Sequence, residues 1–189
     1  MSLILSLFLW SIPILAFNSD IWMIFQKRSE VALDLETAKS YDSQILDFFR
    51  TGLKLGFLNE NELTHMEDVK TVITITNIVF GFSFVSLLTG FSYLSRSQKK
   101  FLLNSVQKTS VFVFVITLIL ATLILTNFQT SFLSFHKIFF VTNFIFPADS
   151  LLKTLYPDTF FRDLAAVYLI SIMVISLVVT VVTHRLKLK

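Results

Sequence analysis

Three histidines are the residues of this 189-residue chain best suited to acid–base chemistry near neutral pH, because an imidazole has an unperturbed pKa close to 6.5. Asp68 follows His65 by three residues. On a helix, both side chains would share one face, and the carboxylate could orient the ring. His136 stands in the apolar stretch SFHKIFF, and His184 precedes the basic sequence RLKLK. We therefore take His65 and His136 as candidate acid–base residues and His184 as a tail residue near lipid headgroups.

Both candidates also have a structural explanation. His65, Asp68 and Lys70 fit an ordinary polar helix entrance at a membrane surface, where Lys70 would extend to anionic headgroups. His136 fits an interfacial aromatic residue among phenylalanines. Spacing alone favours these explanations somewhat over catalysis.

Other kinds of site find little support in the sequence. There is no cysteine, which excludes disulfides, thiolate metal ligands and a cysteine nucleophile. The chain has no H-E-x-x-H, Walker or G-x-S-x-G motif. Two histidines and one aspartate, without a recognisable zinc-binding motif, are weak evidence for a zinc site. We therefore expect catalysis without a metal ion or cofactor.

The composition is that of a membrane protein. Apolar residues make up 54% of the chain and charged residues 15%, and the mean hydropathy is +0.72. An ordinary soluble domain has about a quarter of its residues charged. The pI near 9.2 does not indicate nucleic-acid binding, because the basic residues lie beside apolar runs.

Four apolar segments are expected to cross the bilayer as helices, which takes about 20 residues each. Residues 71–94, 109–135 and 164–183 contain no charge. Residues 2–17 are shorter but lack the basic start and cleavage site of a signal peptide, so we predict a retained anchor. The sequence thus predicts an all-α membrane protein with one domain over residues 1–189.

The charges between these segments predict their sidedness. Residues 95–108 hold four basic and no acidic residues, whereas 18–70 hold six basic and ten acidic residues. Cytoplasmic loops carry the excess of Lys and Arg. The 95–108 loop and both termini are therefore predicted to be cytoplasmic, and 18–70 and 128–163 to be extracytoplasmic. His65 and His136 then lie at the same outer surface of the cell membrane.

A small ordered cap of mixed α/β structure is expected on the outer side. The sequence VALDLE (31–36) alternates apolar and polar residues, as a half-buried strand does. The sequence YDSQILDFFRTGL places four residues on one helical stripe, namely Ile45, Phe48, Phe49 and Leu53. Asn59 followed by Glu62 predicts a helix start that continues into the 71–94 segment.

Two stretches resemble one known family. LGFLNENELTHMEDVK (55–70) is similar to a His-hydrophobic-x-Asp-Val-Lys signature that precedes a membrane span. FHKIFFVTNFIFPADSLLKTLYPDTFF (135–161) is similar to a loop of the form FHxxFF…P…D.LI…P..FF. The family is the bacterial lipoprotein intramolecular transacylases (Lit), which are integral membrane proteins. In VTNFIFPADS the chain departs from the family pattern, lacking two acids and a tryptophan usual there.

The resemblance implies an acyltransferase that acts on a diacylglyceryl-modified lipoprotein. The sn-2 acyl chain would move to the α-amine of the lipoprotein's own N-terminal cysteine, which gives a lyso-form lipoprotein. Carried over by motif position, His65 and His136 become the catalytic pair, with Asp68, Lys70 and Asp149 in supporting roles. Pro157 and the pair Phe160–Phe161 also fall on motif positions.

This chemistry needs no enzyme nucleophile, because amine and ester belong to one substrate molecule. It needs a base, donors for the oxyanion and an acid for the leaving oxygen. We expect His65 to be the base, oriented by Asp68, and His136 to be the oxyanion donor or acid, while the opposite assignment stays open. The expected partners are the lipoprotein and membrane lipid, with no nucleic acid. The alternatives are a non-enzymatic lipid-binding or accessory subunit and a histidine-dependent membrane lipid hydrolase.

Overall fold

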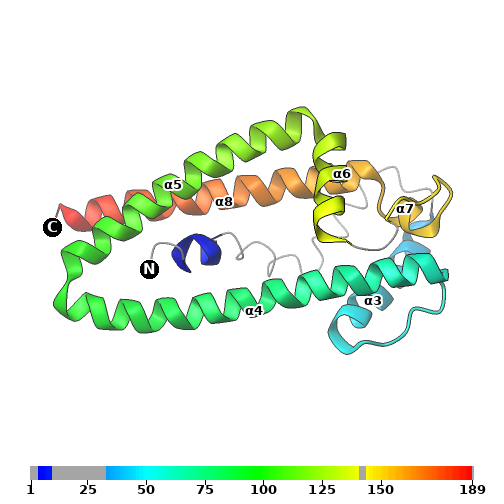
Figure 1. The fold of residues 1–189 in the computed structure, drawn as a ribbon, viewed down its shortest axis with the longest axis horizontal. Helices are drawn as coiled ribbons and strands as arrows, with labels where there is room; N and C mark the ends of the chain where they lie inside the picture. The colour runs from blue at the N-terminus through cyan, green and yellow to red at the C-terminus, as the bar shows by residue number, and fades with distance from the viewer. Residues whose placement is uncertain (1–3, 10–32, 141–143, 189) are drawn as a thin grey trace. The chain divides into compact units, whose positions relative to one another are not determined.

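The computed structural model describes residues 4–9, 33–140 and 144–188, which form helices and connecting loops (Figure 1). Close contacts divide the chain into two compact units. Unit 1 comprises Met1–Ala16, Ile75–Thr126 and Ala166–Lys189, and unit 2 comprises Phe17–Thr74 and Asn127–Ala165. Two long helices, α4 (Glu60–Ser97) and α8 (Asp158–Lys187), each have residues in both units.

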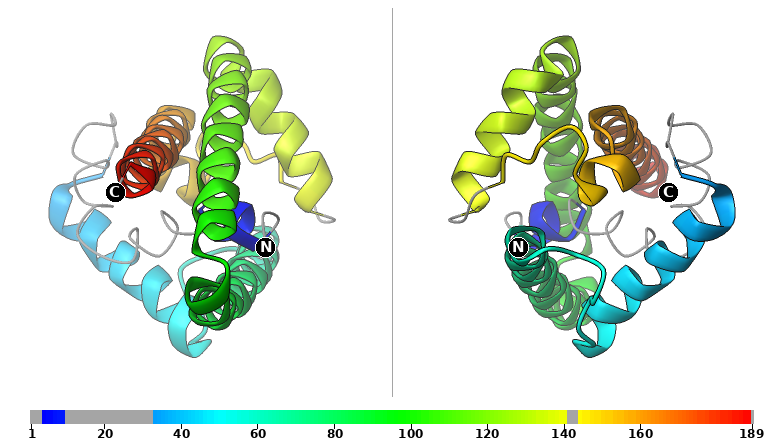
Figure 2. Two further views of the ribbon diagram at one scale, coloured as in Figure 1. Left: turned by 90° about the vertical axis from the view of Figure 1, so that its left-hand side faces the viewer. Right: turned by 90° about the vertical axis from the view of Figure 1, so that its right-hand side faces the viewer.

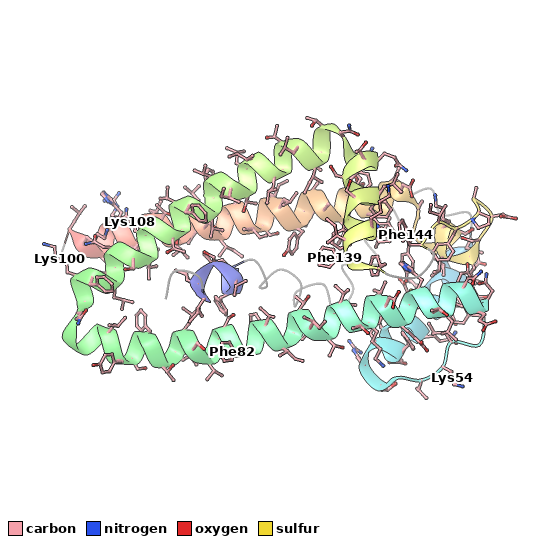
Figure 3. The ribbon with its side chains drawn as sticks, viewed as in Figure 1. Lys54, Phe82, Lys100, Lys108, Phe139 and Phe144 are labelled. Carbon is pink, nitrogen blue, oxygen red and sulfur yellow. The ribbon has the colours of Figure 1, made fainter. Side chains whose placement is uncertain are left out.

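Three helices of the described chain are long and apolar enough to cross a membrane, namely α4, α5 (Lys99–Thr126) and α8. In unit 1 these helices expose large apolar side chains. Phe82, labelled in Figure 3, is 71% exposed. Such outward apolar surface suits contact with lipid. The predicted segments 71–94 and 164–183 lie within α4 and α8. Of the predicted segment 2–17, residues 4–9 are helical, and the rest lies outside the described residues.

A small apolar core holds unit 1 together. It consists of Leu5, Leu9, Val113 and Ile172. The ring of Phe8 stacks on the rings of Phe80 and Phe84 at centroid distances of 5.3 and 5.8 Å. Gln98 alone separates α4 from α5, and the chain reverses direction there (Figure 1). Figure 2 shows the same two helices end-on.

Unit 2 contains α3 (Leu35–Thr51), α6 (Phe128–Phe139), α7 (Leu151–Leu155) and the first turns of α4 and α8. Its core joins one face of α3 to α7 and α8, and its buried members are Ala38, Ile45, Phe48, Leu55, Met66, Leu152, Leu155, Tyr156 and Phe160. Ile45 and Phe48 of the predicted helical stripe are buried in it. Leu53 lies beyond the end of α3 and is 64% exposed, so its place on the stripe was wrong.

The strand expected at 31–36 is wrong where the structure describes it. Asp34 is the N-cap of α3, and its Oδ1 accepts hydrogen bonds from the backbone N–H groups of Glu36 (3.1 Å) and Thr37 (2.9 Å). A capping aspartate stabilises a helix start, which overrides the short alternating pattern. Val31 and Ala32 lie outside the described residues. In the described ranges the cap of mixed α/β structure is therefore helical.

The helix start predicted at Asn59 is confirmed. The Asn59 backbone N–H donates to Glu62 Oε2 (3.1 Å), and the Glu62 N–H donates to Asn59 Oδ1 (3.0 Å). This reciprocal pair is a capping box, which satisfies two backbone donors that have no partner within the helix. From there α4 continues without interruption to Ser97, as the sequence predicted.

The continuous helix expected over residues 109–135 is interrupted. α5 ends at Thr126, and Asn127 takes φ −137° and ψ 62° before α6 begins at Phe128. Thr126 donates its hydroxyl to the Thr122 carbonyl (2.6 Å). Threonine and asparagine side chains compete with the backbone for hydrogen bonds and so favour helix ends. One continuous helix was predicted because this stretch contains no charged residue that would indicate an end. With 12 residues, α6 is too short to cross a bilayer.

Candidate active site

The two candidate histidines lie side by side in unit 2. His65 is on the second turn of α4 and His136 on the last turn of α6. Their ring centroids are 5.9 Å apart, and the rings are inclined by 20°. Each residue is 8% exposed. Both rings line one cavity. The structure thus brings together the two residues, 71 positions apart, that the sequence singled out.

A hydrogen bond fixes the proton on one nitrogen of His136. Its Nδ1 lies 2.8 Å from the carbonyl oxygen of Phe132, one turn earlier in α6. A carbonyl can only accept, so Nδ1 must carry the hydrogen. In the neutral ring, Nε2 then holds the lone pair. Burial lowers the pKa of His136, partly offset by the Phe132 carbonyl and the charge of Asp158. A neutral His136 with an accepting Nε2 can act as a base.

His65 is held by packing. Its Nδ1 is buried and has no hydrogen-bond partner among the described residues, so this nitrogen is not hydrogen-bonded to Asp68. Burial and the neighbouring His136 lower the pKa of His65 to about 4, while the charge of Asp68 acts in the opposite direction. The ring of Phe140 meets it edge-on at a centroid distance of 4.8 Å, and the ring of Phe146 lies 5.3 Å away. Since Nδ1 has no acceptor, the proton of the neutral ring is better placed on Nε2, which can then donate a hydrogen bond to a ligand.

Lys70 and Asp149 do not line this cavity. Lys70 donates from Nζ to the Phe48 carbonyl (3.0 Å) and lies 4.9 Å from the centre of the Phe48 ring. The same carbonyl accepts from the N–H of Gly52, whose φ of 82° ends α3. Lys70 thus stabilises the C-terminus of α3. Asp149 is exposed in the turn before α7. His184 is exposed near the end of α8.

The cavity has a volume of about 260 Å³ and largely apolar walls. Phe132, Phe135, Phe140 and Phe144 contribute to these walls; the last is labelled in Figure 3. The Phe144 ring lies 5.3 Å from that of His136. Such walls suit a hydrocarbon chain. Besides the histidines, the polar or charged side chains lining it are those of Asp42, Lys153, Tyr156 and Asp158.

Asp42 and Tyr156 form a buried pair in the cavity wall that the sequence did not indicate. The Tyr156 hydroxyl donates to Asp42 Oδ1 at 2.5 Å, and Asp42 Oδ2 is buried without a hydrogen-bond partner in the described chain. Burial raises the pKa of Asp42, which the tyrosine hydrogen bond partly offsets, and burial raises the pKa of Tyr156. The available signal was the spacing of Asp42, three residues before Ile45, on the buried stripe of α3.

The sequence did not indicate a role for Asp158, which lines the cavity, or the contact of Glu62 with α7. Asp158, the first residue of α8, forms an ion pair with Lys153 (3.5 Å between Oδ1 and Nζ). Glu62 is 2% exposed, and its Oε1 accepts from the backbone N–H of Leu152 (3.1 Å). The Glu62 carboxylate therefore caps α7 as well as α4.

Comparisons with known proteins agree with this architecture. Residues 1–161 match the family model of the lipoprotein intramolecular transacylase Lit. A solved structure of the membrane integral lipoprotein intramolecular transacylase Lit from Bacillus cereus is similar, with a TM-score of 0.82 and 18% identity over 98% of this chain and 91% of that one. The structure of a variant of that protein with a histidine-to-arginine substitution is also similar. Its TM-score is 0.74 and its sequence identity 17%, over 98% of this chain and 88% of that one. No curated protein sequence matches significantly.

Proposed function

Because the chain belongs to the lipoprotein intramolecular transacylase family, a family of membrane acyltransferases, we propose a specific reaction for it. The sn-2 acyl chain of a diacylglyceryl-modified lipoprotein moves to the α-amine of that lipoprotein's N-terminal cysteine, which leaves an N-acylated lyso-form. The observation that carries this proposal is the stacking of His65 and His136, 5.9 Å apart, on one largely apolar cavity.

His136 is the base in this proposal, and His65 the donor to the oxyanion, which reverses the expectation from the sequence. The reason is the hydrogen bond from His136 Nδ1 to the Phe132 carbonyl, which leaves Nε2 free to accept. The substrate's α-ammonium first releases a proton to water. The neutral amine then attacks the sn-2 carbonyl carbon, and the C=O electrons move to the oxygen. His136 Nε2 takes a proton from the nitrogen, while the N–H of His65 donates to the oxyanion. Asp68, one turn after His65, supports positive charge on that ring.

The second half of the reaction returns the proton. As the carbonyl re-forms, the bond between the carbonyl carbon and the glyceryl oxygen breaks, and this oxygen takes the proton from His136 Nε2. An amide and a free sn-2 hydroxyl result, so the product is an isomer of the substrate. The attack lies within one molecule, which supplies the proximity that a separate nucleophile would otherwise provide.

The charge pattern supports an active site on the outer side of the cell membrane. The loop 95–108 has four basic and no acidic residues, including Lys100 and Lys108, which Figure 3 labels on the first turns of α5. By the positive-inside rule this loop is cytoplasmic. Residues 18–70 and 128–163, and with them both histidines, are then extracytoplasmic, where the lipoprotein substrate is anchored.

Tandem mass spectrometry of lipoprotein N-termini tests this function. Cells that express the wild-type chain should show N-acyl-cysteine fragments on a lipoprotein of unchanged total mass. His65→Phe and His136→Phe, which keep an aromatic ring at each position, should remove these fragments while the protein remains in the membrane. His184→Phe serves as the control at an exposed position.

The same spectra separate the alternatives. A lipid hydrolase would lower the lipoprotein mass by one acyl chain. An accessory subunit would leave activity intact in both histidine variants. Wild-type cells with unmodified lipoprotein N-termini would contradict the proposed function.

A further inference from the structure

The reaction requires the α-amine of the substrate to be held beside the ester. The cavity must therefore contain a group that binds this amine, in addition to the two histidines. An α-amino group has a pKa of about 7.7–8.0, so near neutral pH it arrives mainly as a cation. In a largely apolar cavity, a cation needs a carboxylate partner. Two carboxylates line this cavity, those of Asp42 and Asp158. This inference rests on the proposed function.

Asp42 is poorly placed for the task. Tyr156 already donates to its Oδ1 (2.5 Å), and its Oδ2 is inaccessible. Asp42 as a whole is 5% exposed. A substrate ammonium could reach this carboxylate only if the packed wall of α3 and Tyr156 moved. The pair therefore belongs to the framework of the cavity.

Asp158 differs from Asp42 in access and in its neighbours. Its side chain is 35% exposed, and it lines the cavity. Its charge also acts on His136, where it favours the protonated ring. A carboxylate that is both accessible and electrostatically coupled to the proposed base can hold an ammonium group within the base's surroundings. We propose that Asp158 is the docking group for the α-ammonium of the lipoprotein's N-terminal cysteine.

Lys153 completes this arrangement as a competing cation. Its Nζ lies 3.5 Å from Asp158 Oδ1, and its side chain is 39% exposed. Ion pairs between partly exposed side chains contribute little to stability. The incoming ammonium can therefore share or displace this partner at small cost. Asp158 thus acts as a positioning residue for the nucleophile. Lys153 is the partner of Asp158 before substrate binds, and the strength of that ion pair sets how readily the substrate ammonium can replace it.

Binding of two unreactive probes tests the proposal on the full chain in lipid. Both probes are diacylglyceryl-thioether peptides with an ether in place of the sn-2 ester. One carries the α-amine, and in the other, a desamino probe, hydrogen replaces it. The wild type should bind the amine probe about tenfold more tightly at pH 7, the effect of one hydrogen bond to a charged group.

Three variants then assign this preference to Asp158. Asp158→Asn should bind both probes equally, with its affinity for the desamino probe unchanged. Lys153→Gln should strengthen the preference, because the competing cation is gone. Asp163→Asn is the matched control, since Asp163 forms a similar ion pair with Arg162 (3.2 Å) but does not line the cavity. It should retain the wild-type preference.

Several results would overturn the assignment of Asp158. These are a wild type that does not discriminate between the probes, an Asp158→Asn variant that keeps the preference, and one that loses affinity for both probes equally. The last result would mean a structural role. Failure of the wild type to convert an ester-linked substrate into its N-acyl isomer is a separate observation. It would contradict the proposed function, whatever the probes show.

Discussion

Glu62 Oε1 accepts a hydrogen bond of 3.1 Å from the backbone N–H of Leu152, 90 residues further along the chain. The other carboxylate oxygen accepts from Asn59 N–H (3.1 Å). One buried side chain therefore closes the first turn of α4 and holds the start of α7. Because His65 lies three residues after Glu62 and α7 carries Lys153, this carboxylate links two elements that both contribute side chains to the cavity.

Glu62→Ala should destabilise unit 2. The substitution removes the acceptor of two backbone N–H groups, the buried one of Leu152 and the part-buried one of Asn59. An unsatisfied buried donor costs about 1–3 kcal/mol, and the part-buried one costs less. We expect a loss of about 2–4 kcal/mol in the free energy of unfolding, and reduced transfer activity because α7 is no longer fixed. Thermal unfolding in detergent measures the effect. Glu60→Ala, at an exposed position in the same turn, should change the midpoint little. Equal midpoints for the two variants would contradict this role of Glu62.

The start of α4 shows what local sequence can predict. Asn59 and Glu62 are three residues apart, and their capping box was predicted because both partners lie in one short stretch. The bond from Glu62 to Leu152 could not be predicted in this way. Its existence depends on how α7 packs, and no spacing in the sequence encodes that.

The same distinction between local sequence and packing applies to the residues of the site. His65 and His136 could be selected because topology and motif spacing placed both at one membrane surface, and the structure puts their rings 5.9 Å apart. Asp68 was expected to orient His65 on helical periodicity alone, yet Nδ1 of that ring has no hydrogen-bond partner in the described chain. Periodicity gives the face of a helix but not the direction in which a ring nitrogen points. Tyr156 lies 114 residues from Asp42, so their pairing also needed the fold.

Lys70→Met should destabilise the end of α3. The substitution keeps the length of the side chain but removes the hydrogen bond from Nζ to the Phe48 carbonyl and the contact with the Phe48 ring. Together these interactions are worth about 1–2 kcal/mol. Thermal unfolding should show the loss, while saturating turnover stays close to wild type because Lys70 does not line the cavity. Lys54→Met is the control at an exposed position, labelled in Figure 3. Turnover reduced a hundredfold with an unchanged melting temperature would instead assign Lys70 to catalysis.

Asp42→Asn should gain stability relative to the wild type as the pH rises. Burial raises the pKa of Asp42 above its ordinary value of 3.8. A raised folded-state pKa means that this carboxyl group stabilises the fold most at low pH, and that this contribution is lost as the pH rises through the folded-state pKa. Asparagine is neutral at all pH values and can still accept the Tyr156 hydrogen bond. Melting temperatures of variant and wild type, measured from acidic to neutral pH, should diverge in favour of the variant as the pH rises. A difference in melting temperature between variant and wild type that does not change with pH would contradict an ionisation cost at Asp42.

The pH dependence of turnover should report His136 as the base. Burial lowers the pKa of His136, and Asp158 acts in the opposite direction. The accepting, neutral form of Nε2 is lost as the pH falls through this pKa. Once turnover at saturating substrate is corrected for ionisation of the substrate's α-ammonium, with its pKa of about 7.7–8.0, it should therefore decline further only below the ordinary histidine value of 6.5. Asp158→Asn removes the charge that favours the protonated ring and should move this decline to still lower pH, whereas Asp163→Asn should leave it in place. His136→Gln should lower turnover by about 10²–10⁴-fold and abolish the decline, as loss of an acid–base group does. An acid limb that persists unchanged in His136→Gln would show that another group limits the reaction.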